Sequence, residues 1–259
     1  MREGELSGRT ALVTGAGGTA GEAVARLLAD RGARVIAVDR EADGITALQS
    51  AYGAARVIAR AVDITDRAAV ESLVDEAERT VGPLDILVNA AGVLRAEDVA
   101  ALTDQDWDDL FAVNTTGVFH LSRAVARRMT DRRAGSIITV GAHPVGVPRA
   151  GLAEYAASKA AAALFTKCLG SELASSGVRC NVVSPGAPRV SGTRHRPAAA
   201  GRRGRARGAA WAAQGPAAPP GPAADPHDLA EAVAFLVSDR ARHITMHDLH
   251  ADGALALRA

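Results

Sequence analysis

A tyrosine and a lysine stand four residues apart in the stretch Tyr155-Ala-Ala-Ser-Lys159. On a helix this spacing puts both side chains on one face. A free phenol has a pKa of about 10 and is a poor base at neutral pH, but a nearby ammonium group favours the phenolate and lowers that pKa. The spacing therefore predicts that Tyr155 takes the proton of a hydroxyl group, with Lys159 as its electrostatic partner. The alternative is that both residues merely pack and solvate a helix.

A glycine-rich turn forms a second pattern with chemical meaning, Thr14-Gly-Ala-Gly-Gly-Thr-Ala-Gly21, between an apolar run and an amphipathic stretch. Glycines there let a pyrophosphate approach the backbone, and the helix N-terminus supplies N–H groups. Asp39 ends the next apolar run, where a carboxylate can accept hydrogen bonds from the adenosine ribose and repel a 2′-phosphate. Arg40, the next residue, favours NADP instead, because arginine can pair with that phosphate. We expect NAD rather than NADP. The alternative to a cofactor-binding role is that Asp39 is a solvated charge at the end of a strand.

The elements that must position these residues alternate along the chain. Short apolar runs predict strands at 10–14, 34–38, 56–62, 84–89, 136–140 and 179–183. Amphipathic stretches predict helices at 21–30, 66–80, 104–128, 153–175 and 225–238. Strands joined by single crossover helices give a parallel sheet covered on both faces. We therefore expect one α/β domain over residues 1–259, with the doubly wound, Rossmann-type fold.

Composition excludes several classes of function. Hydrophobic residues make up 48% of the 259 residues and charged residues 23%, which is typical of a globular protein with a sizeable core. A net charge of +1 gives no indication of a nucleic-acid or membrane partner. No signal peptide or membrane-length apolar stretch is visible. Cys168 and Cys180 are interpreted as thiols in a reducing compartment, so a cytoplasmic location is expected.

The segment 187–224 breaks the pattern. It contains seven arginines and no acidic residue, among repeated alanine, glycine and proline. Because it lacks an apolar period, we expect a mobile lid or surface excursion. Nucleic-acid binding is the less favoured interpretation, since Trp211 is the one aromatic residue in it.

Together these motifs resemble the short-chain dehydrogenase/reductase family over nearly the whole chain except 187–224. TGAGGTAG resembles the family's glycine turn, with Thr19 in place of its middle glycine, and VDI at 62–64 resembles the segment whose Asp meets the adenine. Asn89-Ala-Ala-Gly92 resembles the motif that closes the cofactor cleft, and Pro185-Gly186 the turn beside the nicotinamide. The cofactor-binding residues that the resemblance implies are Gly15, Gly17, Thr19, Ala20, Gly21, Asp39, Arg40, Asp63, Ile64, Asn89, Ala91, Gly92, Tyr155, Lys159, Pro185 and Gly186.

The resemblance also implies that Asn114, Tyr155 and Lys159 are catalytic, but it exposes a gap. The family usually carries a serine thirteen residues before the tyrosine, and Ala142 occupies that position. Loss of one oriented donor costs on the order of a hundredfold or more in rate. Thr139 is no simple substitute, because it lies inside the strand. His143 is either a replacement donor or a residue of the loop rim.

A narrower likeness is to the 2,3-dihydro-2,3-dihydroxybenzoate dehydrogenases of siderophore pathways, carried by LVNAAGVLR, FAVNTTGVFHL and PRAGLAEYAASKAA. It implies NAD-dependent oxidation of a cyclohexadiene-diol carboxylate to an aromatic product. A ketone reductase of secondary metabolism and a catalytically impaired scaffold remain alternatives. Arg95 and Arg149 are candidates for holding the substrate carboxylate. The likeness also implies a homotetramer. We assign no metal to His243, His247 and His250.

Overall fold

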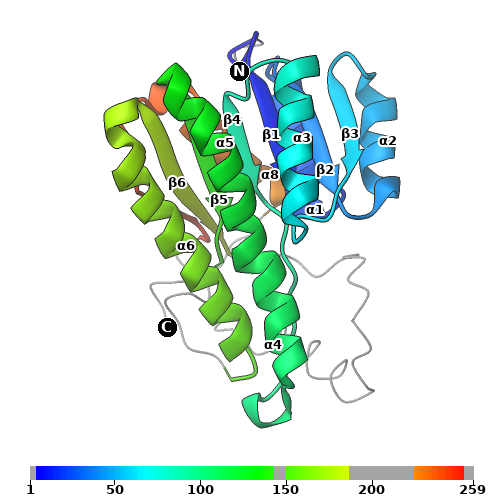
Figure 1. The fold of residues 1–259 in the computed structure, drawn as a ribbon, viewed down its shortest axis with the longest axis vertical. Helices are drawn as coiled ribbons and strands as arrows, with labels where there is room; N and C mark the ends of the chain where they lie inside the picture. Colours follow the sequence, from blue (N-terminus) through cyan, green and yellow to red (C-terminus); the bar gives the residue numbers. More distant parts are fainter. Residues whose placement is uncertain (1–3, 143–149, 187–224, 254–259) are drawn as a thin grey trace.

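Seven parallel strands form one sheet in the order β3-β2-β1-β4-β5-β6-β7 (Figure 1). The computed structural model describes residues 4–142, 150–186 and 225–253. The strands are β1 (Thr10–Thr14), β2 (Arg34–Asp39), β3 (Val57–Ala61), β4 (Ile86–Asn89), β5 (Gly135–Val140), β6 (Val178–Pro185) and β7 (Asp248–Ala251). The order reverses direction between β1 and β4, which is the switch point where doubly wound folds bind ligands.

Helices cover both faces of this sheet. They are α1 (Thr19–Asp30), α2 (Ala42–Tyr52), α3 (Arg67–Thr80), α4 (Asp104–Phe111), α5 (Val118–Arg132), α6 (Ala153–Leu173) and α8 (Pro226–Val237). The shorter helical segments are η1 (Val99–Ala101), η2 (Ala112–Gly117), η4 (Ala174–Ser176) and η5 (Asp239–Ala241). In Figure 1, α3, α5 and α6 lie in front of the sheet, whereas α1 and α8 lie behind it.

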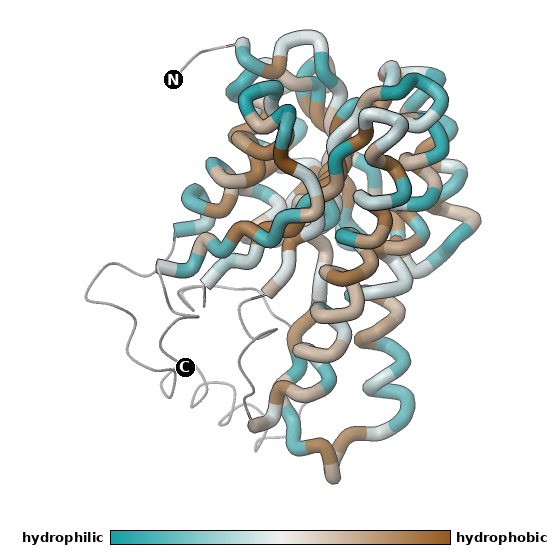
Figure 2. Tube along the Cα trace, turned by 90° about the vertical axis from the view of Figure 1, so that its left-hand side faces the viewer, coloured by the Kyte–Doolittle hydropathy of each residue, from teal (hydrophilic) through white to brown (hydrophobic). Residues whose placement is uncertain are grey.

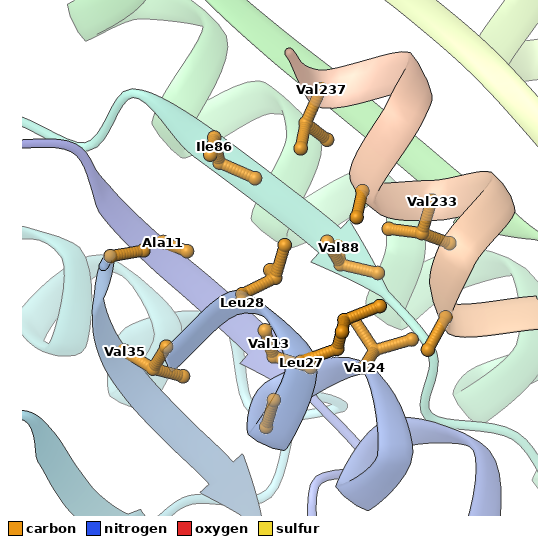
Figure 3. Packing of buried hydrophobic residues seen from close by; sticks show 14 of the residues in the cluster. Ala11, Val13, Val24, Leu27, Leu28, Val35, Ile86, Val88, Val233 and Val237 are labelled. Atoms are coloured by element: carbon orange, nitrogen blue, oxygen red, sulfur yellow. The ribbon is translucent and has the colours of Figure 1, made fainter. Parts of the chain in front are cut away.

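Two hydrophobic clusters, one on each face, hold the layers together. Figure 3 shows the first, in which Leu28 and Val24 of α1 and Val233 of α8 pack on β1, β2 and β4. The second contains Leu12 and Leu87, which point to the opposite face. Successive strand residues are therefore buried on alternate sides, which explains why the strands read as continuous apolar runs. Figure 2 shows the hydrophobic strands at the centre and hydrophilic residues mainly on the outer turns of the helices.

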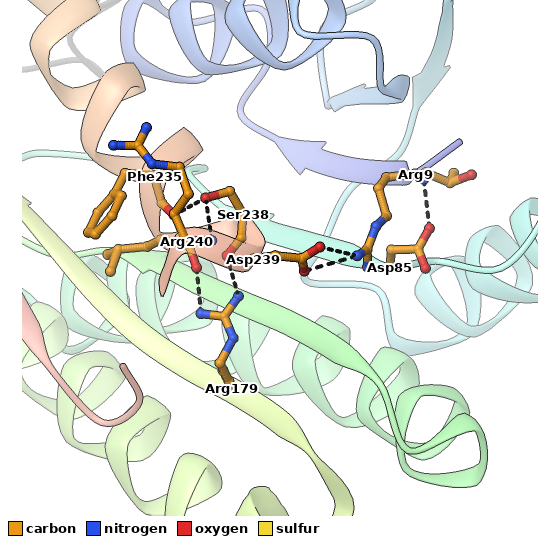
Figure 4. A network of polar contacts seen from close by, with 9 residues as sticks. Arg9, Asp85, Arg179, Phe235, Ser238, Asp239 and Arg240 are labelled. Atoms are coloured by element: carbon orange, nitrogen blue, oxygen red, sulfur yellow. Dashed lines mark hydrogen bonds and ion pairs between the residues drawn. The ribbon is translucent and has the colours of Figure 1, made fainter. Parts of the chain in front are cut away.

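A polar network fixes the ends of the strands opposite to the expected cofactor site (Figure 4). The partly buried Arg179 guanidinium donates to the Leu236 and Ser238 carbonyl oxygens at the end of α8, at 2.5 and 3.3 Å. Burial lowers the pKa of this side chain below its usual range. Nearby, Arg9 pairs with Asp239 at 3.1 Å. These contacts tie β6 to the end of α8, and the residue before β1 to η5, and they leave the other ends of the strands for ligands.

The predicted fold class is confirmed, with two local corrections. The sequence pattern predicted no helix between Asp39 and Val57, because α2 is short and contains Gly44. Gly44 packs on the glycine turn: a Cβ on Gly44 would lie 2.8 Å from the Gly17 Cα. The helix expected at 104–128 is interrupted by the π-helix η2 and continues to Arg132. Single π-helical turns often mark functional sites, and this one carries the buried Asn114.

Within the described ranges, no helix is long and apolar enough to cross a membrane. The segment 187–224, for which we expect a lid or surface excursion, lies outside the described residues.

Candidate active site

The carboxyl ends of the strands bring the predicted site residues to one edge of the sheet. Thr14 is in register with Asn89, and Asn89 with Thr139, across β1, β4 and β5. Asp39 ends β2 on one side of this group, and Pro185 ends β6 on the other. Because all the strands are parallel, the segments that leave them start at one edge of the sheet, where doubly wound folds bind their ligands.

The glycine turn has the backbone geometry that makes glycine necessary. Gly15 has a φ of +67°, and a Cβ there would lie 2.7 Å from the Ala91 Cα. A Cβ on Gly21 would lie 2.2 Å from the Gly15 carbonyl oxygen. Thr19 and Ala20 begin α1, whose N-cap Gly18 provides no side-chain hydrogen bond. The end of α1 therefore presents backbone N–H groups to an anion, as a pyrophosphate site requires.

Asp39 is held directly against this turn. Its Oδ2 accepts a hydrogen bond from the Gly17 N–H at 3.0 Å, and its Oδ1 accepts from the Glu41 N–H at 3.2 Å. Arg40 is exposed and pairs with Glu41, with 3.6 Å between Nε and Oε1. The carboxylate thus contacts the turn directly, while the guanidinium pairs with Glu41.

The adenine side of the expected site is formed by the segment after β3. The Asp63 Oδ1 accepts hydrogen bonds from the Thr65 N–H at 2.9 Å and the Thr65 hydroxyl at 2.7 Å. Ile64 is buried against η2, where a Cβ on Gly117 would lie 2.6 Å from its side chain. This close approach fixes the segment 63–65 against the helix that carries Asn114.

The motif at 89–92 is anchored from both sides. The Thr14 hydroxyl oxygen accepts hydrogen bonds from the Ala90 and Ala91 N–H groups, each at 3.2 Å. The Asn89 side-chain amide donates to the Ser122 hydroxyl at 3.0 Å, while its Oδ1 is buried without a hydrogen-bond partner among the described residues. Sequence reasoning missed Thr14 as an anchor, although its place immediately before the glycine turn was the available signal.

Asn114 connects three parts of the site. Its Oδ1 accepts from the Val93 N–H at 2.9 Å, and its Nδ2 donates to the Val93 carbonyl at 2.9 Å and to the Ser158 hydroxyl at 3.1 Å. Ser158 in turn donates to the Tyr155 carbonyl at 2.8 Å. The predicted catalytic residues on η2 and α6 are therefore brought together, with Ser158 as a bridge that the sequence pattern did not reveal.

Lys159 lies one turn beyond Tyr155 on α6 and closes the group. Its Nζ donates to the Val140 carbonyl at the end of β5, at 3.1 Å. A Cβ on Gly92 would lie 3.0 Å from the same Nζ, so a larger residue there would displace the ammonium group. The lysine is therefore fixed between β5 and the segment that follows β4.

Burial controls the titration of both side chains in the chain without cofactor. Desolvation raises the pKa of Tyr155 to about 12. It also lowers the pKa of Lys159 to about 8. Both groups are driven towards their neutral forms, because a low-dielectric environment penalises charge on either. In the chain by itself, Lys159 does not make Tyr155 a phenolate.

The place of the usual serine is filled by a buried alanine, Ala142. Nearby hydroxyl groups are already engaged. Thr139 and Thr166 share a hydrogen bond of 2.7 Å, and Ser184 donates to the Asp248 carboxylate at 2.8 Å. These hydroxyl groups therefore do not supply the missing donor. His143 and Arg149 lie outside the described residues, so their roles stay predictions.

Arg95 is not a free cation. Its guanidinium forms an ion pair with Asp106 in the first turn of α4. The Pro185-Gly186 turn is also fixed, because the Gly186 N–H donates to the Ala251 carbonyl at 3.0 Å. The described part of the chain holds no cluster of three or more His, Cys, Asp or Glu residues suited to a metal ion; His250 lies between Asp248 and Asp252 instead.

Comparison with known proteins identifies the family. Residues 9–199 match the family model for short chain dehydrogenases, so the chain belongs to this family. It is 44% identical to a 2,3-dihydro-2,3-dihydroxybenzoate dehydrogenase of Bacillus subtilis, with 97% of each chain covered. It is 39% identical to the 3-oxoacyl-acyl-carrier-protein reductase FabG of Escherichia coli, over 96% of this chain and 98% of the relative.

A solved structure agrees with these relatives. A short chain dehydrogenase/reductase family protein superposes with a TM-score of 0.83 and 31% identity, covering 96% of this chain and 97% of the other. The family resemblance predicted from the motifs is confirmed, and the protein is an oxidoreductase.

We predict that Lys159→Met raises thermal stability at neutral pH. Below pH 8 the wild-type ammonium is charged and buried, so the folded state carries its full desolvation cost; between the folded pKa of about 8 and the ordinary value of 10.5 that cost disappears. The gain in melting temperature should therefore shrink as the pH rises through this window. Lys167→Met, at a partly exposed lysine of the same helix, is the control. A Lys159→Met protein that melts lower than wild type at neutral pH would contradict the claim that burial of the Lys159 ammonium destabilises the folded state.

Proposed function

We propose that the protein oxidises a ring hydroxyl of a cyclohexadiene-diol carboxylate, of the 2,3-dihydro-2,3-dihydroxybenzoate type, towards an aromatic product, with NAD as acceptor. The observation that carries this proposal is the 44% identity, over 97% of both chains, to a dehydrogenase named for that substrate. Loss of a hydride and a proton from such a ring leads to aromaticity, which makes the reaction strongly downhill. The reaction would belong to siderophore or secondary-metabolite biosynthesis.

The residues of the cleft fit NAD. Gly15, Gly17 and Gly21 leave room for a pyrophosphate at the end of α1, and Asp39 places a carboxylate where the adenosine ribose would bind. When bound, NAD supplies the hydride acceptor and a positively charged ring. A 2′-phosphate would meet the Asp39 carboxylate, whereas Arg40 is exposed and paired with Glu41. These contacts favour NAD over NADP.

Tyr155 is the base in this proposal. Its phenol oxygen would accept the proton of the substrate hydroxyl, which requires the phenolate. Burial opposes the phenolate, so positive charge beside the ring must lower the tyrosine pKa from its raised value. Lys159, fixed on the Val140 carbonyl, provides one such charge while it is protonated. Asn114 holds Val93 and Ser158 and thereby keeps the helix of the tyrosine in place.

Two alternatives have specific support. The 39% identity to a 3-oxoacyl-acyl-carrier-protein reductase favours ketone reduction on the same scaffold. Ala142 favours a catalytically impaired, cofactor-binding protein, since the described hydroxyls nearby have other partners. Retention of Asn114, Tyr155 and Lys159 in one connected group weighs against that second alternative.

The homotetramer is proposed from the helix face formed by α5 and α6. Phe119 is 38% exposed and Leu164 is 64% exposed, and the Phe119 ring packs edge-on against Phe165 at 5.8 Å between centroids. Arg123 lies 4.6 Å above the Phe119 ring. Exposed apolar side chains on two adjacent long helices suit association with the same face of a second copy. Analytical ultracentrifugation at micromolar concentration tests this, and a monomer would refute it.

We predict that 2,3-dihydro-2,3-dihydroxybenzoate reduces NAD in the presence of the protein, and that NADP supports the reaction at least about tenfold less efficiently, because Asp39 would have to face a 2′-phosphate. Absorbance of the reduced cofactor measures both rates. A 3-oxoacyl thioester with NADH or NADPH is the comparison substrate. Preferential turnover of that thioester would replace the dehydrogenase proposal with the reductase alternative, and equal use of NADP would show that Arg40 dominates.

We predict that Ala142→Ser raises turnover of the ring diol by about tenfold or more, because it restores one oriented hydrogen bond to the reacting oxygen. Tyr155→Phe should abolish turnover while leaving NAD binding within about twofold, since it removes only the base. His143→Ala tests whether that residue supplies the missing donor. If Ala142→Ser has no effect and His143→Ala inactivates, the serine role is filled by His143. If neither Ala142→Ser nor Tyr155→Phe alters any turnover, the catalytic assignment is wrong.

A further inference from the structure

Thr166 of α6 and Thr139 of β5 form a buried hydroxyl pair that the proposed chemistry does not use. Both residues are almost completely buried. Their hydroxyl oxygens lie 2.7 Å apart. The Thr166 hydroxyl also donates to the Ala162 carbonyl, one turn earlier in α6, at 2.8 Å. Because a hydroxyl group has one proton, Thr139 is the donor in the pair and Thr166 is the acceptor.

This pair lets α6 lie closer to β5 than apolar side chains would allow. Hydrogen-bonded hydroxyl oxygens approach to about 2.7 Å, whereas carbon atoms in van der Waals contact stay about 3.5–4.0 Å apart. A methyl group in place of either hydroxyl would therefore move the helix away from the strand at this point by up to about 1 Å.

The Lys159 ammonium depends on the same close approach. Lys159 precedes Thr166 by seven residues, which is about two helical turns, so both side chains lie on one side of α6. Val140 follows Thr139 directly in β5, and its carbonyl accepts the hydrogen bond of the Lys159 Nζ at 3.1 Å. Two successive residues of β5 thus hold α6 at two points. A shift of about 1 Å would stretch the lysine bond beyond hydrogen-bond range.

We propose that Thr139 and Thr166 are positioning residues, whose hydroxyl pair sets the distance between α6 and β5 at which the Lys159 ammonium reaches the Val140 carbonyl. The inference rests on the proposed role of Lys159 beside Tyr155, but it does not depend on the ring-diol substrate. Neither threonine is assigned a contact with substrate or cofactor.

The exchange of ammonium protons in the free protein tests this directly. The chain has two lysines, Lys159 and Lys167, so heteronuclear NMR resolves their ammonium groups and Lys159→Met assigns them. At about pH 6, below its pKa of about 8, the Lys159 side chain is charged. In Thr139→Val and in Thr166→Val, the Lys159 ammonium protons should exchange with water at least about fivefold faster, because their hydrogen bond opens more often. Exchange at Lys167 should stay within about twofold of wild type.

Two further sets of variants separate the hydroxyl contact from general effects on stability. Thr139→Ser and Thr166→Ser keep the hydroxyl groups and should keep exchange at Lys159 within about twofold of wild type. Thr80→Val is the matched control, because the Thr80 hydroxyl makes the same bond to a carbonyl four residues earlier, at 2.8 Å, on an exposed part of α3. It should leave Lys159 unchanged.

A double-variant cycle shows whether the two threonines act as one unit. The variant that combines Thr139→Val with Thr166→Val should match the single variants, because one methyl group already separates α6 from β5. If Thr166→Val does not fold, Thr139→Val decides the test, since it leaves the bond from Thr166 to the Ala162 carbonyl in place.

Unaltered exchange at Lys159 in the folded valine variants would overturn the proposal, even if their melting temperatures fall. So would additive effects of the two substitutions, or serine variants that exchange as fast as the valine variants. The measurement uses no substrate, so it is separable from the proposed function. Faster exchange in the valine variants together with undiminished turnover by Lys159→Met would keep the positioning of the lysine and refute its part in the reaction.

Discussion

The paired hydrogen bonds between the Asn114 side chain and the Val93 backbone are the contact on which the site depends. They join η2, the segment after β4 and, through Ser158, the helix α6 that carries Tyr155 and Lys159. Asn114 is fully buried, so breaking these bonds would leave its amide and a backbone N–H and C=O unpaired. Asn114 lies in the π-helical turn η2. Gly117 allows the same turn to approach Ile64 closely.

The close packing around Asn114 also determines how easily Tyr155 and Lys159 carry a charge. It excludes water from Lys159 and encloses most of Tyr155, and burial then pushes the tyrosine pKa up and the lysine pKa down. A phenol that resists ionisation in the free chain is a base only when further positive charge lies beside it. Ala142, in the position of the family's usual donor, is also buried, being only 5% exposed.

The sequence predicted the parts of the structure that local pattern encodes. The strand 10–14 was placed with its observed ends, and the glycine turn was read correctly because its neighbours signalled a strand before it and a helix after it. The short helix α2 was missed because Gly44 weakens its apolar period, and the π-helix was missed because one extra residue per turn leaves no clear trace in spacing.

Contacts between segments that are distant in the sequence were the main limit on predicting the site. Neither the pairing of Arg95 with Asp106 nor the burial of Glu154 can be read from either residue's neighbours in the chain. The raised tyrosine pKa of the chain without cofactor could not be predicted for the same reason, since the i,i+4 spacing shows the lysine but not the dry environment around both groups. The Asn114 bridge through Ser158 likewise needed the fold, although both residues lie in recognisable motifs.

The central claim, that burial keeps Tyr155 protonated until charge is brought beside it, can be tested by spectrophotometric titration. The chain has two tyrosines, Tyr52 and Tyr155, and the pKa of each is raised, that of Tyr52 by burial and by its hydrogen bond to Asp30. The difference between wild type and Tyr155→Phe in phenolate absorbance isolates Tyr155. The account predicts that no phenolate from Tyr155 forms in the free protein until strongly alkaline pH, near its pKa of about 12. Ionisation of Tyr155 near neutral pH in the cofactor-free protein would contradict it.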